Sequence, residues 1–324
     1  MKAVLYPFGA GADEPTLQLT QDFPEVAWAI ARSPEEIARE IGEAAILVTS
    51  NRVCTPAYGE ALRRAATRTL RWIHFTSAGI DGGVAMGLPD WATVTNSTGV
   101  KAAMVSEHAL MLLLALVRRL PDMQADQRLR RWRREETNVK LRTLSGAVVC
   151  VIGLGSIGRE VARKARAFDA RVIAVSRKGS PGGDVEQVFP RERIGEALAL
   201  ADAAVICTSA DDTSFHLIDA AALAAAKSTA FLVNVARGNI VDGMALAAAL
   251  HAQRLAGAAL DVTEAEPLPA DSPLWETPNL VISPHVAGGG TTGYPQQKAL
   301  FADNLARHVA GQPLRNVCRM PVGE

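Results

Sequence analysis

Three polar residues in the second half of the chain are of types that can move protons and bind carboxylates. Arg237 and His285 each come directly after an apolar segment with strand character, and Glu266 follows another such segment after a short loop. A histidine can exchange a proton with a reacting oxygen, because its ordinary pKa of about 6.5 lies near neutrality. A carboxylate beside it stabilises the imidazolium and fixes its orientation, and an arginine can bind a carboxylate through two parallel hydrogen bonds. Each residue alone is also compatible with a structural role, so the argument depends on the three together.

A glycine-rich turn supplies the second chemical signal. The sextet Gly153-Leu154-Gly155-Ser156-Ile157-Gly158 fits the pattern G-x-G-x-x-G, between an apolar segment (147–152) and a helical stretch (159–168). That context is the one in which the pattern binds a dinucleotide. The first glycine permits the tight turn, the second lets the backbone approach the pyrophosphate, and the third allows close packing of the helix. We therefore predict that all six residues form a dinucleotide site, with the phosphates at the helix N-terminus.

The residues after the next strand bear on which dinucleotide is bound. NAD-binding sites carry a carboxylate there for the ribose 2′-hydroxyl, but this strand ends in Ser176-Arg177-Lys178, and the next acid is Asp184. Asp169 precedes the strand and is expected at its other end. A hydroxyl and two cations instead suit the 2′-phosphate of NADP. We predict that Ser176, Arg177 and Lys178 bind NADP, with NAD as a less preferred cofactor; two solvated loop cations are the alternative interpretation.

The elements that must position these residues alternate between strands and helices, which predicts parallel sheets covered by helices on both faces. The fold class is therefore α/β, with two Rossmann-like or flavodoxin-like doubly wound domains. The chain of 324 residues is long enough for both. Strands are expected at Lys2–Leu5, Val26–Ala29, Ala45–Thr49, Trp72–Phe75 and Thr93–Thr95, and then at Ala147–Ile152, Val172–Val175, Ala204–Cys207, Phe231–Val235, Ala258–Asp261 and Leu280–Ile282.

The domain boundaries follow from this alternation. A long helix is expected at Lys101–Arg119, and the last segment has one good helix (Gln296–Val309) but no strand set of its own. We infer that this helix packs on the first domain. Residues 1–99 with 287–324 then form a discontinuous flavodoxin-like domain that binds substrate, and residues 100–286 form the dinucleotide-binding Rossmann domain. In an open α/β sheet, the carboxyl ends of the strands line the ligand crevice.

The composition excludes several functional classes. Thirty-four basic residues balance thirty-four acidic ones, which argues against a nucleic-acid partner. The longest apolar run, Ala109–Val117, is far shorter than the roughly twenty residues that span a bilayer, so no membrane association is expected. Four scattered cysteines have neither disulfide nor metal-ligand spacing. We expect a cytoplasmic protein without a metal site.

Four motifs together resemble the D-isomer-specific 2-hydroxyacid dehydrogenase family. They are Gly153–Gly158, Asn234-Val235-Ala236-Arg237-Gly238, Asp261-Val262 through Glu266-Pro267, and Ser283-Pro284-His285-Val286-Ala287-Gly288. The likeness spans nearly the whole chain, including Ser106-Glu107-His108 in the long helix. It implies an oxidoreductase in which His285 is the general acid/base, Glu266 its partner and Arg237 the clamp for the substrate carboxylate and carbonyl.

The resemblance extends to the substrate loop and to assembly. The loop Ser77-Ala78-Gly79-Ile80-Asp81 matches the family's substrate loop, whose backbone N–H groups hold a carboxylate. Members usually dimerise through the cofactor domain, partly through the helix that here contains Ala109–Val117, so we expect a homodimer. Further cofactor contacts are expected from a set of residues at strand ends, in addition to His285: Cys207, Val235, Ala236, Asp261, Ala287 and Gly288.

Two departures from the family pattern bear on the reaction. Thr263 stands where an aromatic residue is common, which alters packing near the site and not the chemistry. The second strand of the dinucleotide-binding domain is not followed by an acid. In this respect the chain resembles the NADP-using glyoxylate/hydroxypyruvate reductases, so a small 2-oxo acid and its D-2-hydroxy acid are the expected substrate pair. Residues that choose among such acids are not fixed by the sequence; the candidates are Arg52, Trp132, Tyr294 and Met320.

Two other functions remain compatible with the sequence. A dinucleotide-binding regulator of the same fold would keep the glycines but has no need for Arg237, Glu266 and His285 together. A dehydrogenase of a different oxyanion would keep all of them.

Overall fold

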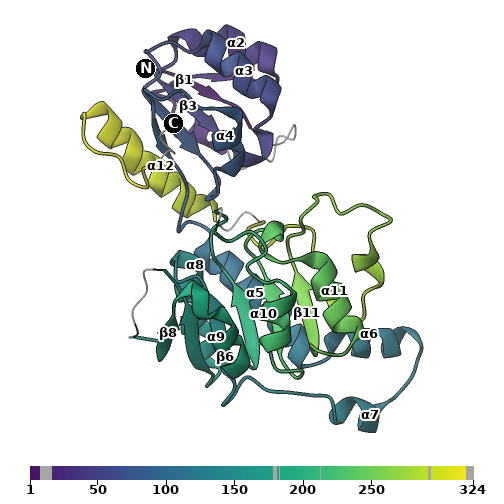
Figure 1. Ribbon diagram of the computed structural model, residues 1–324. Coiled ribbons are helices and arrows are strands. Elements are labelled where there is room, and N and C mark those ends of the chain that lie inside the picture. The colour runs from purple at the N-terminus through teal and green to yellow at the C-terminus, as the bar shows by residue number, and fades with distance from the viewer. Residues whose placement is uncertain (8–16, 178–180, 182, 212, 291–292, 319–324) are drawn as a thin grey trace. The chain divides into compact units, whose positions relative to one another are not determined.

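The computed structural model describes residues 1–7, 17–177, 181, 183–211, 213–290 and 293–318. The chain divides into two compact units, which we call unit 1 (Met1–Lys101 with Gly290–Glu324) and unit 2 (Ala102–Gly289). The sequence placed the divisions after residues 99 and 286, a few residues earlier. Each unit is an α/β structure built on one parallel sheet (Figure 1), which is the fold class that the alternation of strands and helices predicts.

Unit 1 contains a five-stranded sheet in the order β2-β1-β3-β4-β5. Its strands are β1 (Lys2–Leu5), β2 (Ala27–Ile30), β3 (Ile46–Thr49), β4 (Trp72–Phe75) and β5 (Thr93–Thr95). Its helices are α1 (Gln18–Asp22), α2 (Pro34–Glu40), α3 (Pro56–Ala65), α4 (Asp81–Met86) and α12 (Tyr294–Val309), with short 3-10 turns at η2 (Ile41–Glu43) and η3 (Asn51–Val53). Ser33 caps α2 by accepting a hydrogen bond from the Glu36 N–H.

Helices cover both faces of this sheet, and one face combines helices from both ends of the described chain. One face packs against α2 and α3, and the other packs against α1 and α12. Phe301 of α12 is fully buried and stacks on Trp72 of β4, with ring centroids 5.3 Å apart. The last helix therefore completes the core of the first sheet, as the lack of any strand in its own neighbourhood predicts.

Unit 2 contains a seven-stranded parallel sheet in the order β12-β11-β10-β9-β6-β7-β8. Its strands are β6 (Val148–Ile152), β7 (Arg171–Val175), β8 (Gln187–Phe189), β9 (Ala203–Ile206), β10 (Phe231–Asn234), β11 (Gly257–Leu260) and β12 (Leu280–Ile282). The strand β8 was not predicted. The strand order changes direction between β6 and β9, and this is the point at which open α/β sheets bind their ligands.

Helices cover both faces of the second sheet (Figure 1). Helices α5 (Ala102–Val117) and α8 (Ser156–Ala167) pack on one face, and α9 (Ile194–Leu200), α10 (Ala220–Ala225) and α11 (Gly243–His251) pack on the other. The remaining elements are α6 (Leu120–Arg128), α7 (Arg134–Asn138) and the turns η4 (Arg191–Arg193), η5 (Gly238–Ile240) and η6 (Pro273–Glu276). No helix among the described residues has the length and apolarity to cross a bilayer.

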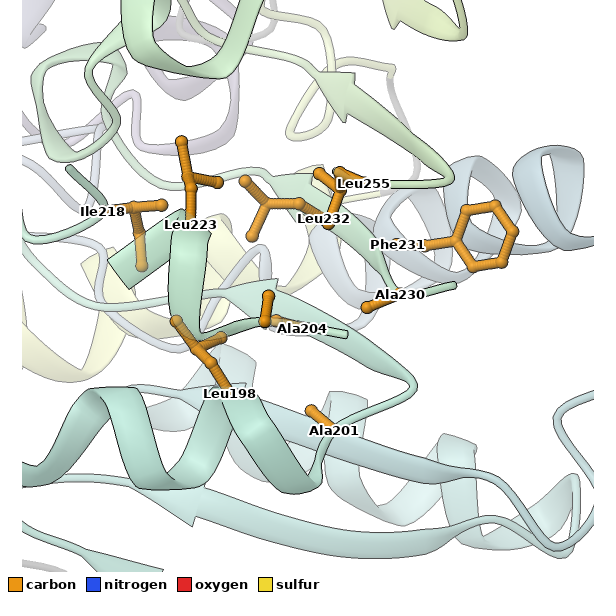
Figure 2. Close-up of a pocket in the computed structure, with 10 residues that line it drawn as sticks. Leu198, Ala201, Ala204, Ile218, Leu223, Ala230, Phe231, Leu232 and Leu255 are labelled. Atoms are coloured by element: carbon orange, nitrogen blue, oxygen red, sulfur yellow. The ribbon is translucent and has the colours of Figure 1, made fainter. Parts of the chain in front are cut away.

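A small apolar cavity lies in the core of unit 2, between α9, α10 and the sheet (Figure 2). Its volume is about 10 Å³, and its lining includes Leu198, Leu223, Leu232 and Leu255. A space of this size without polar partners does not hold a stable water. It is a packing defect of the core and not a ligand site.

Candidate active site

His285 and Glu266 form a hydrogen-bonded pair at the carboxyl edge of the second sheet. His285 Nδ1 lies 2.6 Å from Glu266 Oε2, and both side chains are a little over one-third exposed. The other Glu266 carboxylate oxygen accepts a hydrogen bond of 3.2 Å from the backbone N–H of Thr263. Because Nδ1 faces Glu266, Nε2 is the ring nitrogen that can exchange a proton with a reacting group. Thr263, the departure from the family pattern, therefore helps to orient Glu266 through its backbone.

The backbone at His285 is held in an uncommon conformation. Its φ is 52°, in the left-handed region that residues other than glycine seldom adopt. The His285 N–H donates to the backbone carbonyls of Asp261 at 2.7 Å and Ser283 at 3.0 Å. Such conformations persist only where the surroundings determine them, and they concentrate at functional sites.

A buried carboxylate fixes the loop that carries His285. Asp261 is 1% exposed. Its Oδ1 accepts hydrogen bonds from the Ser283 hydroxyl at 2.6 Å and the Val286 N–H at 3.0 Å, and its Oδ2 accepts one from the Ala287 N–H at 2.9 Å. His108 of α5 supports the same group, with Nε2 3.0 Å from the Ser283 hydroxyl and 3.3 Å from Asp261 Oδ1. The polar groups of Asp261 and Ala287 thus bind each other, and a contact of either residue with a cofactor stays a prediction.

The loop of Arg237 packs against the loop of Glu266. Asn234, at the end of β10, donates from its side chain to the Arg237 carbonyl at 2.8 Å. A Cβ atom on Gly238 would lie 1.9 Å from the carbonyl carbon of Thr263, so only glycine fits there. This close approach places the backbone of Arg237 beside the segment that leads to Glu266. The Arg237 Nη1 donates to the Ala236 carbonyl at 2.8 Å.

The glycine turn fits the chemistry expected of a dinucleotide site. Gly153 has a φ of 102°, and a Cβ there would lie 2.6 Å from the Thr208 Cα. A Cβ on Gly158 would lie 1.9 Å from the Gly153 carbonyl oxygen, so the helix packs tightly on the strand end. A Cβ on Gly155 would meet nothing within 4 Å. That open space beside the N-terminus of α8 is where a pyrophosphate can approach the backbone.

The other residues expected to contact the cofactor lie at carboxyl ends of neighbouring strands. Cys207 follows β9, Val235 and Ala236 follow β10, and Ala287 and Gly288 follow β12. Burial raises the pKa of the Cys207 thiol to about 12, so this thiol is protonated at neutral pH and is no nucleophile.

The region after β7 contains no carboxylate at the strand end. Ser176 is half-buried and its N–H donates to the Phe189 carbonyl at 2.9 Å, while Arg177 is exposed. Arg177 Nη2 lies 3.0 Å from Asp211 Oδ2. Lys178 lies outside the described residues. Asp211 was not predicted as a site residue, because it reaches Arg177 from the loop after a different strand.

The predicted substrate loop belongs to unit 1. The Ser77 hydroxyl accepts from the Asn51 N–H at 3.1 Å and donates to the Gly79 carbonyl at 2.8 Å, and Asn96 donates to the Ala78 carbonyl at 2.7 Å. Within the described part of the chain, the backbone N–H groups of Ala78 and Gly79 donate to no protein acceptor. The loop is thus held by its hydroxyl and carbonyl groups, with two adjacent N–H groups left for an anion.

Three of the four candidate specificity residues can be placed. Arg52 lies in η3, beside the Asn51 that anchors the substrate loop. Trp132 is 93% exposed between α6 and α7. The Tyr294 hydroxyl donates to Asp22, so it serves the packing of α12. Met320 lies outside the described residues.

Comparison with known proteins agrees with this geometry. Residues 110–287, more than half of the chain, match the model of the "D-isomer specific 2-hydroxyacid dehydrogenase, NAD binding domain". The chain belongs to the D-isomer specific 2-hydroxyacid dehydrogenase family. The glyoxylate reductase of Thermofilum pendens is 33% identical over 226 residues, which cover 68% of this chain and 66% of that protein. The D-3-phosphoglycerate dehydrogenase of Archaeoglobus fulgidus is 30% identical over 308 residues, 92% of this chain and 55% of that one. The chain thus spans about half the length of this second relative.

Solved structures of the D-isomer specific 2-hydroxyacid dehydrogenase family share the fold. A member from Aeromonas salmonicida has a TM-score of 0.85 and 31% identity, with 99% of both chains covered. A second, from Xanthobacter autotrophicus, was solved in complex with NADPH and MES; it has a TM-score of 0.82 and 28% identity, with 98% of both chains covered. Both likenesses extend over nearly the whole chain.

Proposed function

We propose that this dehydrogenase prefers NADP(H) and interconverts a small 2-oxo acid and its D-2-hydroxy acid, in the manner of glyoxylate/hydroxypyruvate reductases. NAD(H) is the less preferred cofactor. The observation that carries the proposal is the 2.6 Å contact between His285 and Glu266, beside the loop of Arg237 at the carboxyl edge of the second sheet.

The glycine turn Gly153–Gly158 would hold the dinucleotide, which when bound would supply the hydride for the carbonyl carbon. His285 Nε2 donates a proton to the carbonyl oxygen as the alkoxide develops, and Glu266 stabilises the imidazolium before that transfer. We assign binding of the substrate carboxylate to the Arg237 guanidinium of unit 2, which can form two parallel hydrogen bonds. Separately, within unit 1, we propose that the N–H groups of Ala78 and Gly79 bind a carboxylate. In the reverse direction His285 accepts the hydroxyl proton.

The residues after β7 support the preference for NADP. The strand end offers Ser176 and Arg177 and no carboxylate for a ribose 2′-hydroxyl. The Xanthobacter autotrophicus relative was solved with NADPH, which supports the same choice for this chain.

We further propose a homodimer formed through unit 2. The exposed apolar side chains of the segment after α5 support it, because Leu129 is 58%, Trp132 93% and Val139 72% exposed. Most of the segment Ala109–Val117 is buried within its own unit, and Met111 is half exposed. Any contribution of that helix to a dimer must therefore come from its edge around Met111.

Oxidation of NADPH and of NADH, followed by absorbance, tests the proposal with glyoxylate, hydroxypyruvate, pyruvate, 2-ketogluconate and phenylpyruvate. We expect turnover with NADPH favoured, and a loss of roughly two to four decades in the variant His285→Gln. Asp169→Asn is the matched control, because Asp169 is exposed and precedes β7, at the opposite edge of the sheet. Binding of a dinucleotide without turnover of any acid would favour a regulator or another oxyanion substrate.

A further inference from the structure

Three loops at the carboxyl edge of the second sheet meet in a cluster of charged and hydroxyl side chains. Arg177 follows β7, Arg191 begins η4 after β8, and Asp211 and Thr213 lie in the loop after β9. Asp211 contacts both guanidinium groups, with Arg191 Nη1 at 2.9 Å and Arg177 Nη2 at 3.0 Å from its carboxylate oxygens. We call these residues the Asp211 cluster.

The Asp211 cluster adjoins the glycine turn. Arg191 Nη2 donates to the Thr208 hydroxyl at 3.0 Å, and Thr208 is the residue against which Gly153 packs. The Ser176 N–H donates a hydrogen bond to the carbonyl of Phe189, at the end of β8. The cluster therefore lies where a dinucleotide on the turn would extend its adenosine ribose, beyond the end of the second strand.

Asp211 is saturated as an acceptor. Besides both arginines, its Oδ1 accepts from the Thr213 N–H at 3.1 Å and from the Thr213 hydroxyl at 2.6 Å. A carboxylate has about four acceptor sites, so little capacity remains for a ribose hydroxyl. Asp211 therefore does not substitute for the acid of an NAD site.

The charges of the cluster do not balance. Two guanidinium groups face one carboxylate, and Arg191 is only 8% exposed. The excess positive charge is carried at the exposed member, Arg177, whose side chain is 56% exposed. An arginine held in this way loses less conformational freedom when it binds a second anion.

We propose that Asp211, itself anchored by buried Arg191, is a positioning residue that holds the Arg177 guanidinium ready for the 2′-phosphate of NADP. This inference rests on the proposed function, since it explains the cofactor preference of the same site. Asp211 acts through Arg177 and does not touch the phosphate.

Two ligand fragments isolate this effect from catalysis. Adenosine 2′,5′-bisphosphate and AMP differ only by the 2′-phosphate, and calorimetry measures the dissociation constant of each without turnover. In wild type we expect the bisphosphate to bind more tightly. In Asp211→Asn we expect that advantage to fall by about tenfold, the equivalent of one charge-assisted hydrogen bond. Asp169→Asn, an exposed Asp-to-Asn change elsewhere in the unit, should keep the full advantage.

A double-mutant cycle distinguishes positioning from a merely structural role. Arg177→Ala alters an exposed side chain and should fold; it should remove the same advantage. Because Asp211 acts through Arg177, the double variant should lose no more than Arg177→Ala alone. Additive losses, an unchanged advantage in Asp211→Asn, or tighter binding of the bisphosphate in that variant would overturn the proposal.

These measurements also distinguish a failure of the proposed function from a failure of the role assigned to Asp211. If wild type binds both fragments equally, the NADP preference is wrong, whatever Asp211 does. If NADPH and NADH both bind but no 2-oxo acid is reduced, the assigned reaction is wrong while the fragment measurements still decide the role of Asp211.

Discussion

The hydrogen bonds that hold the buried Asp261 carboxylate, here called the Asp261 clamp, allow a quantitative prediction for the substitution Asp261→Asn. The native carboxylate accepts three hydrogen bonds, two of them from the backbone N–H groups of Val286 and Ala287. An asparagine amide has one acceptor oxygen, and its NH2 group must face one of those two donors in either orientation. One buried N–H is then unsatisfied, and the remaining bonds lose their charge assistance. We expect a loss of about 2–4 kcal/mol in the free energy of unfolding.

The same substitution should lower turnover, because the clamp holds the loop of His285. A displacement of that ring by about 1 Å is enough to cost roughly two decades in kcat. The assays are urea denaturation and NADPH oxidation at saturating substrate, with Ser283→Ala as a milder variant that removes one of the three bonds, for about 1 kcal/mol. The reasoning is refuted if Asp261→Asn keeps its unfolding free energy within about 0.5 kcal/mol of wild type. A raised KM for NADPH with unchanged stability and kcat would instead assign Asp261 to cofactor contact.

Three further predictions concern other parts of unit 2. Arg237→Lys should raise the KM for the 2-oxo acid by about tenfold or more, because the guanidinium fork is lost although the charge remains; normal kinetics would remove Arg237 from carboxylate binding. Burial raises the pKa of Asp211, but the hydrogen bonds and charges of its partners outweigh it and lower that pKa to about 2. Since the folded pKa is depressed, its stabilisation is present above about pH 4 and is lost as the pH falls towards 2. The difference in unfolding free energy between wild type and Asp211→Asn should therefore be constant from pH 5 to pH 8 and shrink below pH 4; shrinkage near pH 6 would contradict this. Burial also raises the pKa of Cys150 and Cys207 to about 12, although Cys207 is partly exposed. A thiol reagent at pH 8 should therefore modify both slowly until urea is added, because the reactive thiolate is scarce, and rapid labelling of both in the native protein would contradict this.

The fold could be predicted because strands of both sheets, such as β3, β4, β9, β10 and β11, are fully buried and read as short apolar runs. Of the strands in the described residues, β8 was missed: it has three residues (Gln187–Phe189), and one of them is exposed. Because β8 lies at the edge of the sheet, it buries little apolar surface, and its sequence shows no periodic pattern of apolar residues. The sequence therefore also showed no sign of the Asp211 cluster, because β8 positions Arg191 in it.

The pairing of His285 with Glu266 could be anticipated because adjacent parallel strands bring their carboxyl ends to one edge. The contacts that support this pair and the neighbouring loops could not be anticipated. His108 and Ser283 are 175 positions apart, and Arg191 and Asp211 come from separate loops. Only the three-dimensional arrangement shows that Asp261, expected to contact a cofactor, has a carboxylate already engaged by its own domain.

The return of α12 to the first sheet has a consequence for folding during synthesis. The strands of unit 1 leave the ribosome first, but one face of their sheet is covered only in part, by α1, until residues 294–309 have been made. Unit 2 is contiguous and can complete its core while the earlier unit still waits for Phe301 and Leu305. Domains usually fold in the order of their synthesis. Here the second unit is expected to be native before the first, whose sheet keeps an incompletely covered apolar face, accessible to chaperones, until α12 has been made.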